Sequence, residues 1–600
     1  MEMCIVDAAN RKTPQCLWES VVRHHSYAGH PAPFEFTKGK EAIEAALRKA
    51  ADNCSGNLAH MRIIKHLSWP SGLFAVALQS LLIIAFLAIG LGDLLAEDAP
   101  AEIYTYPLPT IYTNSTEYAL AINGTNVPIA EFTSQYDYAE LSATDVPIHV
   151  AITAPRISSI TSYRISPEKL GVIAVVSNNT ITFSLHSPHN LIISVNNVKP
   201  FALCMDPPET DVPPSSGPGI FNVLGSPYNA DNSGLNLTGA ALQSAVNDAS
   251  AYGHAHGRGI VYVAAGVYLS GNLQLANNTA LYLQSGAVIR CTGNPRDYTK
   301  NSPLLGSFAN RKVPGTWLLY ATNGVNIKLY GRGTIDGNGY YMALSNHFGD
   351  NLLMLNCTNF AAEGITFRDA GGWGIVAGQS ANIAFTNVKI FNNLSVAEDD
   401  CMDIVNSENV TISKIFGIAG DDTISTKTYY NYPFSGLQGD LNISISDSFL
   451  WSQYVACKIG WGVGRPQSNI TFSNIVVYNC QNGVGIEMYQ DGNTVQNVTF
   501  DTIDIENKRL GSPGSQAWGW FEARTSKGLV TNVSVRNVVV RQTGTNGFFG
   551  SDTNSATFAG VTFNQICMPD ETRPASTLGQ MDFFKLGSYS RLTIVPASPP

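Results

Sequence analysis

The stretch Asn382-Ile-Ala-Phe-Thr-Asn-Val-Lys-Ile390 decides the fold of this chain. It contains an Asn, an aliphatic residue, a variable residue and an apolar residue, followed by a second short segment that begins at Asn387. Successive side chains of a β-strand point to opposite faces. The aliphatic and apolar positions therefore face inward and the variable position faces outward, which predicts two short, one-sided strands.

The same pattern recurs through the second half of the sequence. Its copies begin at Asn326, Asn382, Asn409, Asn442, Asn469, Asn497 and Asn532, and a related unit begins at Asn359. Successive copies are 23 to 35 residues apart. One coil of a parallel β-helix needs about that many residues, and each coil buries its inward side chains only by stacking on its neighbours. No helices alternate with these strands, and the longer hairpins of a propeller are missing. The sequence predicts an all-β chain built around a right-handed parallel β-helix.

Turn residues and composition shifts divide the chain outside the repeat. Residues 103–205 carry short alternating segments separated by turns, which predict a small antiparallel β-sandwich domain. The Pro-, Ser- and Gly-rich stretch 207–219 is expected to be a boundary. A helical pattern over 236–252 is placed to close one end of a β-helix that spans 218–545. We expect residues 546–600 to form a C-terminal tail that packs on the β-helix.

One long apolar run, residues 73–91, precedes the β-rich part of the chain. It is nearly long enough to cross a bilayer, and no amphipathic pattern surrounds it as it would around a buried helix. Basic residues within 62–66 place positive charge on the cytoplasmic side, so the bulk of the chain is expected to cross the membrane. Residues 61–96 are predicted to be a signal peptide or signal anchor, and 1–60 a cytoplasmic tail or a mispredicted extension. The predicted location is extracellular, either secreted or membrane-anchored with the catalytic domain outside.

The charge balance restricts the partners of the chain. The formal net charge of −10 gives no basic face for nucleic acid. The absence of a C-x-x-C pair argues against a zinc site. Export would make N-x-S/T triplets glycosylation sites, although Asn-Val-Thr also arises from strand-forming sequence. These triplets begin at Asn114, Asn123, Asn178, Asn236, Asn277, Asn356, Asn393, Asn409, Asn442, Asn469, Asn497 and Asn532.

The densest group of carboxylates predicts the catalytic centre. It comprises Asp400 and Asp403 in the segment 398–403, and Asp421 and Asp422 about one short coil later. Residues one coil apart lie roughly 4.8 Å apart along the stack. Neighbouring carboxylates disfavour each other's ionisation, so one can stay protonated as a general acid while another activates water. A diagonal across two coils would supply the roughly 6.5–9.5 Å between carboxyls that inverting glycosidases use. Calcium binding and solvated turns are the alternatives.

Adjacent strand residues point to opposite faces, which is a difficulty for the pair Asp421–Asp422. Both carboxylates can serve one groove only if a bend or bulge lies at this position. We expect such an irregularity there.

At these residues the sequence resembles the polygalacturonase family, glycoside hydrolase family 28. That family has an N-T-D-x-x-D segment, then D-D about one coil later, then G-H-G and R-x-K. The resemblance covers residues 218 to about 545. It implies that Asp421 is the general acid and that Asp400 and Asp422 hold the attacking water.

The later family motifs differ here, and the differences bear on the substrate. The G-H-G coil corresponds to Tyr454-Val-Ala-Cys-Lys-Ile-Gly460, which lacks a histidine, and R-x-K falls on Gly485-Ile-Glu487. A glutamate would repel a uronate, which favours a neutral polysaccharide whose hydroxyls Glu487 binds. The chain is also similar to the dextranase and isopullulanase family, glycoside hydrolase family 49, which places a β-sandwich before a β-helix and uses comparable acids.

Aromatic and basic residues near the acids are candidates for substrate binding. Aromatic rings stack on the apolar faces of sugars, and Trp373, Trp461 and Tyr430 flank the acids, although a single aromatic residue is more often core or surface. Asp403 and Lys427 complete the predicted binding set. Lys427 has a second interpretation, a salt bridge to an acid of the same cluster.

Three functions compete for this sequence. The leading one is an inverting glycoside hydrolase that acts on a polysaccharide or oligosaccharide as a monomer, with no metal ion or cofactor. A polygalacturonase-like pectin hydrolase is the close variant of this function. A calcium-dependent polysaccharide lyase would need a basic proton acceptor, and no Arg/Lys cluster accompanies the acids. A non-catalytic glycan-binding β-helix would not need Asp400, Asp421 and Asp422 to converge.

Overall fold

The computed structural model describes most of the chain after residue 101. The described residues are 102–145, 147–298, 301–302, 315–344, 348–430, 439–507, 517–525, 527–542, 544, 547–552, 556–569 and 571–596. The predicted cytoplasmic segment 1–60, signal segment 61–96 and apolar run 73–91 lie outside them. Within the described ranges, no helix has both the length and the hydropathy needed to span a membrane.

Residues 103–206 form two sheets that share one hydrophobic core. The first contains β1 (Ile103–Thr105), β4 (Ala130–Phe132), β5 (Tyr136–Ala143), β7 (Tyr163–Ser166), β10 (Leu191–Val195) and β11 (Phe201–Asp206). The second contains β2 (Ala119–Ile122), β3 (Thr125–Val127), β6 (Ile148–Thr153), β8 (Val175–Ser177) and β9 (Thr180–Leu185). The expected sandwich is present, with one difference from a purely antiparallel arrangement, because β5 and β11 pair in parallel.

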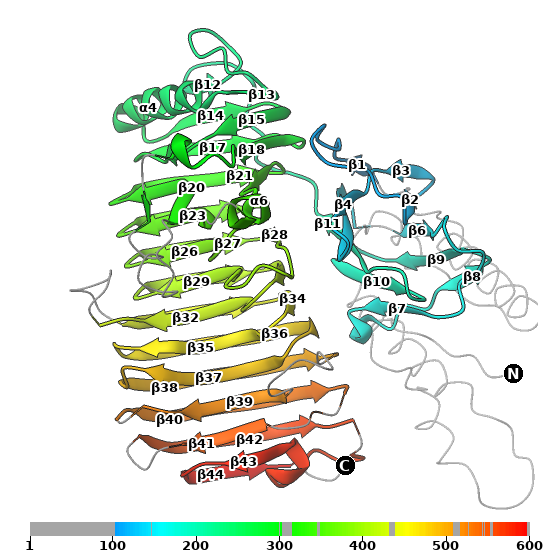
Figure 1. Cartoon of the computed structure of the whole chain (residues 1–600), viewed down its shortest axis with the longest axis vertical. Coiled ribbons are helices and arrows are strands. Elements are labelled where there is room, and N and C mark those ends of the chain that lie inside the picture. The colour runs from blue at the N-terminus through cyan, green and yellow to red at the C-terminus, as the bar shows by residue number, and fades with distance from the viewer. Residues whose placement is uncertain are drawn as a thin grey trace, which may run out of the picture. The chain divides into compact units, whose positions relative to one another are not determined.

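The rest of the described chain is a parallel β-helix, as the Asn repeat predicts (Figure 1). One sheet of the β-helix has 21 strands. They are β12 (Ile220–Asn222), β13 (Ser233–Leu237), β14 (Gly259–Val263), β15 (Gly266–Ser270), β17 (Thr279–Leu283), β18 (Ala287–Cys291), β21 (Val325–Gly331), β22 (Thr334–Asp336), β24 (Thr358–Glu363), β25 (Thr366–Arg368), β27 (Ala381–Thr386), β28 (Lys389–Phe391), β30 (Glu408–Ser413), β31 (Phe416–Ala419), β33 (Asp440–Ser446), β34 (Phe449–Ser452), β36 (Gln467–Asn479), β38 (Thr494–Ile505), β40 (Leu529–Val540), β42 (Thr557–Cys567) and β44 (Ser590–Val595).

The second sheet of the β-helix has 12 strands and is called the active-site sheet below. Its strands are β16 (Leu273–Gln274), β19 (Asn301–Ser302), β20 (Gly315–Thr322), β23 (Phe348–Leu355), β26 (Ile375–Gly378), β29 (Met402–Val405), β32 (Ile424–Thr428), β35 (Val455–Val463), β37 (Asn482–Gln490), β39 (Ala517–Ala523), β41 (Gly547–Ser551) and β43 (Phe583–Leu586). The prediction of a C-terminal tail after residue 545 is wrong, because β41 to β44 extend both sheets by further coils.

The described residues also contain two helices and three 3-10 turns. The predicted helix is α4 (Gly239–His256), which lies at the first end of the stack in Figure 1 and packs Leu242 and Val246 into the core. The others are α6 (Gly339–Leu344) and the 3-10 turns η2 (Glu168–Leu170), η3 (Pro295–Asp297) and η4 (Gly579–Met581). By covering the first coils, α4 shields apolar side chains that have no preceding coil to stack on.

The Asn at the start of each repeat forms a ladder along the stack. Each takes a left-handed backbone conformation with φ between 52° and 58°, which Asn tolerates better than most residues. In Asn326 and in the copies from Asn382 onward, the side-chain Nδ2 donates to the Oδ1 of the Asn one coil earlier, for example from Asn442 to Asn409 at 3.0 Å. Asn409, Asn442, Asn469, Asn497 and Asn532 all donate in this way and all begin N-x-S/T triplets. A ladder that uses the Nδ2 atom accounts for these five triplets without glycosylation.

Asn442→Ala is expected to lower the free energy of unfolding by about 3–4 kcal/mol. The change removes two ladder hydrogen bonds, one donated to Asn409 and one accepted from Asn469, each contributing about 1 kcal/mol. It also forces Ala into a left-handed conformation at a cost of roughly 1–2 kcal/mol. Chemical denaturation measures the change. Ser444→Ala, an exposed change on the same strand, is the control, and an Asn442→Ala protein as stable as this control would contradict the ladder's contribution.

Side-chain alternation on the active-site sheet determines which residues face outward. In β29, Met402 and Ile404 belong to the hydrophobic core of the β-helix. The intervening Asp403 therefore faces away from that core. The parallel register continues this outward row through Ser425 of β32 to Lys458 of β35. Carboxylates and lysines far apart in the sequence are thus brought onto one outer surface.

Candidate active site

The three predicted catalytic aspartates converge. Asp400 precedes β29, and Asp421 and Asp422 lie in the turn between β31 and β32. One carboxylate oxygen from each residue lies within 4.8 Å of the other two. The backbone N–H of Asp422 also donates to Oδ1 of Asp400 at 3.1 Å. Because Asp421 and Asp422 occupy a turn and not a strand, alternation does not separate them, which resolves their adjacency without a bulge.

The spacing of these acids bears on one expectation. Their nearest carboxylate oxygens lie within 4.8 Å of one another, whereas the separation of about 6.5–9.5 Å expected for an inverting enzyme is measured between whole carboxyl groups. The expected diagonal stays a prediction.

Two buried lysines each form ion pairs with two of the carboxylates. Lys427 Nζ lies 2.6 Å from Asp400 Oδ2 and also contacts Asp403. Lys458 Nζ lies 2.9 Å from Asp422 Oδ2 and 3.1 Å from Glu487 Oε2. Burial lowers the pKa of each ammonium, but the surrounding carboxylates outweigh it and hold both pKa values well above their usual range. Both lysines therefore remain charged.

Asp421 stands apart from this pairing. No ion pair joins it to a Lys or Arg of the described residues, and its Oδ2 accepts only a long hydrogen bond, 3.3 Å, from the backbone N–H of Glu398. Burial, followed by the charges of Asp400 and Asp422, raises the pKa of Asp421 well above its usual range. Burial also raises the pKa of Asp422, against the opposing effect of Lys458. Asp421 is thus the member of the trio best placed to hold a proton.

The same three carboxylates are the candidate ligands for a metal ion among the described residues. Oxygen ligands of this type suit Ca²⁺ or Mg²⁺. Two of the three, Asp400 and Asp422, already bind an ammonium group at 2.6 and 2.9 Å. A divalent ion would have to compete with both lysines, so the arrangement fits acid–base chemistry better than cation binding.

The predicted binding residues lie around the acids in two different settings. Trp373 is buried, and the centre of its ring lies 3.9 Å from Lys427 Nζ, so the ring packs against the lysine that binds Asp400 and Asp403. Trp461 is 36% exposed and Tyr430 is 52% exposed, so both present ring surface. Glu487 is fully buried and contacts Lys458. Their roles in substrate binding stay predictions.

Sequence reasoning gave Lys458 little weight and missed a group one coil further on. That group comprises Tyr489, Glu522 and Arg524, which continue the outward rows of β37 and β39. The register pairs Glu487 with Glu522. The available signal was the recurrence of a short segment that begins with Gly and ends with Glu, first Gly485-Ile-Glu487 and then Gly519-Trp-Phe-Glu522.

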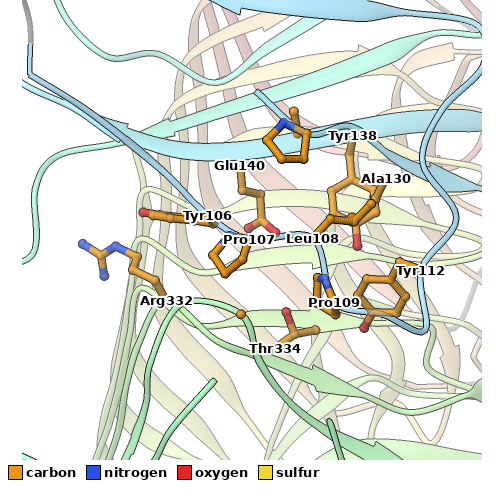
Figure 2. Close-up of a pocket in the computed structure, with 13 residues that line it drawn as sticks. Tyr106, Pro107, Leu108, Pro109, Tyr112, Ala130, Tyr138, Glu140, Arg332 and Thr334 are labelled. Carbon is orange, nitrogen blue, oxygen red and sulfur yellow. The ribbon is translucent and has the colours of Figure 1, made fainter. Parts of the chain in front are cut away.

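A pocket between the sandwich and the β-helix does not contain the acids (Figure 2). Its lining includes Tyr106, Tyr112, Glu140, Arg332 and Thr334. Arg332 Nε lies 3.2 Å from Asp206 Oδ2, and Glu140 accepts a hydrogen bond from Thr366. Its charged groups are therefore already bound to other residues of the chain. The contacts of Arg332 with Asp206 and of Thr366 with Glu140 join the β-helix to the sandwich.

Comparison with known proteins identifies a family that this chain resembles. Residues 307–545 match the family model described as glycosyl hydrolases family 28. A protein named "Probable polygalacturonase" from Vitis vinifera is 22% identical over 51% of this chain and 66% of its own length. An exopolygalacturonase from Cochliobolus carbonum is 22% identical over 41% of this chain and 58% of its own length. The chain thus spans less than two thirds of these curated relatives.

Among solved structures, Dex49A from Penicillium minioluteum is 12% identical with a TM-score of 0.49, over 82% of this chain and 96% of its own. The polygalacturonase from Erwinia carotovora ssp. carotovora is 16% identical with a TM-score of 0.48, over 64% and 99%. The family match confirms the predicted resemblance to family 28, which is a family of glycoside hydrolases.

Proposed function

We propose that this protein hydrolyses a glycosidic bond of a polysaccharide, with Asp421 as general acid and with Asp400 and Asp422 activating water. One observation carries the proposal. Three carboxylates lie together, and two of them are bound to buried ammonium groups, whereas no Lys or Arg of the described residues pairs with the third. This asymmetry assigns opposite protonation states to neighbouring groups, which acid–base hydrolysis requires.

The proposed reaction adds one water molecule across the bond. Asp421 donates its proton to the glycosidic oxygen as the bond to the sugar carbon breaks. One of Asp400 and Asp422, which are paired with the Lys427 and Lys458 ammonium groups, accepts a proton from the water that attacks that carbon. This proton is then released to solvent, and Asp421 takes up a proton from solvent to restore the starting state.

We propose inversion, in line with the family 28 resemblance, because a carboxylate that shares its charge with an ammonium is a weak nucleophile but a good water ligand. The close approach of the nearest oxygens keeps retention as a second candidate, since retaining enzymes place their carboxyls only about 5–5.5 Å apart. The anomeric form of the first product distinguishes the two.

We propose that the sugar bound at the acids is neutral. Lys427 and Lys458 each already bind two carboxylates, so neither is free to bind a uronate there. A second candidate is hydrolysis of homogalacturonan, which the names of the curated relatives favour.

A panel of polymers tests both candidates. Dextran, pullulan, α-1,3-glucan, homogalacturonan and rhamnogalacturonan are incubated with the protein, and new reducing ends and product anomers are measured. Reducing ends without an unsaturated, UV-absorbing product are expected. An unsaturated product and loss of activity with a chelator would instead indicate a lyase. No cleavage of any polymer would favour a non-catalytic β-helix that only binds glycans.

We further propose that the enzyme acts outside the cell as a monomer. The apolar run 73–91 after a basic segment supports export, with the run serving as a cleaved signal or as a membrane anchor. Sequencing the N-terminus of protein recovered from the medium and from membranes separates these two outcomes.

Glu487→Gln is expected to shift the acid limb of the pH profile of kcat/KM to lower pH. Glu487 shares Lys458 with Asp422. Without the negative charge of Glu487, the Lys458 ammonium pairs with the carboxylate of Asp422 alone. This favours the ionised form of Asp422 and lowers its pKa. The acid limb reports the group that must be ionised, so it moves down with that pKa. Glu408→Gln on β30 of the other sheet is the control, and a limb that stays in place or moves up would contradict the assignment.

A further inference from the structure

A continuous series of contacts runs from the acids to Arg524 along the outer surface of the active-site sheet. Lys458 Nζ lies 2.9 Å from Asp422 Oδ2 and 5.5 Å from the centre of the Trp461 ring. The Trp461 and Tyr489 ring centres are 4.6 Å apart. The guanidinium carbon of Arg524 lies 4.4 Å from the centre of the Tyr489 ring. The catalytic centre and Arg524 therefore belong to one surface.

Arg524 is held in place by its neighbours. Its Nε donates to Glu522 Oε1 at 2.7 Å, and its guanidinium stacks on Tyr489. Glu522 is itself fixed, because its Oε2 accepts hydrogen bonds from Tyr489 Oη at 2.7 Å and from Trp520 Nε1 at 2.8 Å. The Glu522 side chain is only 2% exposed, whereas the Arg524 side chain is 49% exposed. The guanidinium is thus anchored to Glu522 while about half of the Arg524 side chain stays exposed, with Asp552 near enough to act on it electrostatically.

The exposed part of Arg524 has the chemistry of a carboxylate receptor. With Nε committed to Glu522, the two terminal nitrogens can donate a pair of parallel hydrogen bonds to one carboxylate. The exposed Trp461 ring, which contacts this series through Tyr489, offers an apolar surface to a sugar face. An arginine that only paired with Glu522 would not need this exposure.

We propose that Arg524 binds the carboxylate of an acidic sugar in the substrate, at a subsite separate from the catalytic acids. This inference rests on the proposed hydrolase function and deepens it. The strands β32, β35, β37 and β39 are consecutive in the sheet, so the subsite lies three inter-strand steps, roughly 14 Å, across the sheet from the turn that carries Asp421. The total separation is larger, because Asp421 precedes β32 whereas Arg524 follows the end of β39. The substrate is then a polymer with a neutral sugar at the scissile bond and a uronate a few sugars away.

This assignment accounts for two features that otherwise conflict. The lysines beside the acids are saturated by carboxylates, which disfavours a uronate there. The curated relatives are nevertheless named polygalacturonases. A uronate bound at Arg524, and not at the scissile bond, satisfies both.

Binding to a hydrolysis-deficient protein tests the subsite. The Asp421→Asn variant is titrated with rhamnogalacturonan oligosaccharides, in which uronates alternate with neutral sugars, and with the same oligosaccharides after chemical reduction of their carboxyl groups. Adding Arg524→Gln is expected to weaken binding of the acidic oligosaccharides about 10- to 100-fold, as loss of a charge-assisted pair of hydrogen bonds implies. Binding of the reduced oligosaccharides should change less than about threefold.

Arg536→Gln is the matched control. Arg536 has a similar exposure, 48%, but pairs with Asp501 and lies on β40 of the other sheet. The proposal is overturned if Arg524→Gln and Arg536→Gln bind the acidic oligosaccharides equally well, or if Arg524→Gln weakens acidic and reduced ligands alike. Because the readout is binding and not cleavage, failure of the hydrolase function would show separately, as no product from any polymer with the wild-type protein.

Discussion

Replacing Asp421 by Asn should lower kcat by about 10²- to 10⁴-fold, the range expected for loss of a general acid. Asn has nearly the same shape but carries no acidic proton for the leaving oxygen. The substitution should not unfold the protein, because burial raises the pKa of Asp421 and no lysine or arginine of the described residues pairs with its carboxylate. Initial rates and thermal unfolding of the two proteins measure both expectations.

The leaving group provides the discriminating control. An aryl glycoside of the cleaved sugar releases a stable phenolate, which needs little protonation as it leaves. On that substrate, Asp421→Asn should therefore keep much of the wild-type activity. Asp422→Asn removes a group that activates water, and its activity should stay low on both substrates. If Asp421→Asn cleaves the polymer as fast as wild type, another residue is the acid.

The repeat made the fold predictable because the same residue type, Asn, takes the same left-handed backbone conformation in successive coils. Each coil needs a left-handed residue at the same corner, and Asn fills it while its amide bonds to the Asn of the adjacent coil. The aliphatic positions that follow are fixed by the core. No such constraint marks the last coils, where Asn gives way to Gly560, and the strands after residue 545 were therefore mistaken for a tail.

The site was predictable as far as the acidic motif extends. Asp400, Asp421 and Asp422 share a motif with a known family, whereas Lys458 becomes their partner only through the register of β32 and β35. More than thirty residues separate Asp422 from Lys458, and sequence spacing alone does not show which of them face outward. Arg524 is linked to the acids only through two further strand pairings, β35 with β37 and β37 with β39. The sequence alone does not show these pairings.

Lys427→Met should lower the free energy of unfolding by about 3–5 kcal/mol at neutral pH, the cost of removing one partner from a buried ion pair. Lys427 binds Asp400 and Asp403, and all three side chains are almost completely buried. Without the ammonium, two carboxylates would face each other in a low-dielectric interior. This loss is a large fraction of the roughly 5–15 kcal/mol that stabilises a typical folded protein.

The pH dependence of that loss identifies its cause. Burial already raises the pKa of Asp403 well above its usual range, and Lys427 opposes the rise. In Lys427→Met the folded pKa must rise further, so the folded protein binds protons that the unfolded chain releases. Its stability is then fully present below the unfolded pKa and is lost as pH rises through the folded pKa. The deficit relative to wild type, measured by denaturation at a series of pH values, should shrink towards acid. Lys414→Met, an exposed lysine of the other sheet, should show no deficit at any pH. A deficit independent of pH would mean that Lys427 stabilises the site by packing against Trp373 and not by its charge.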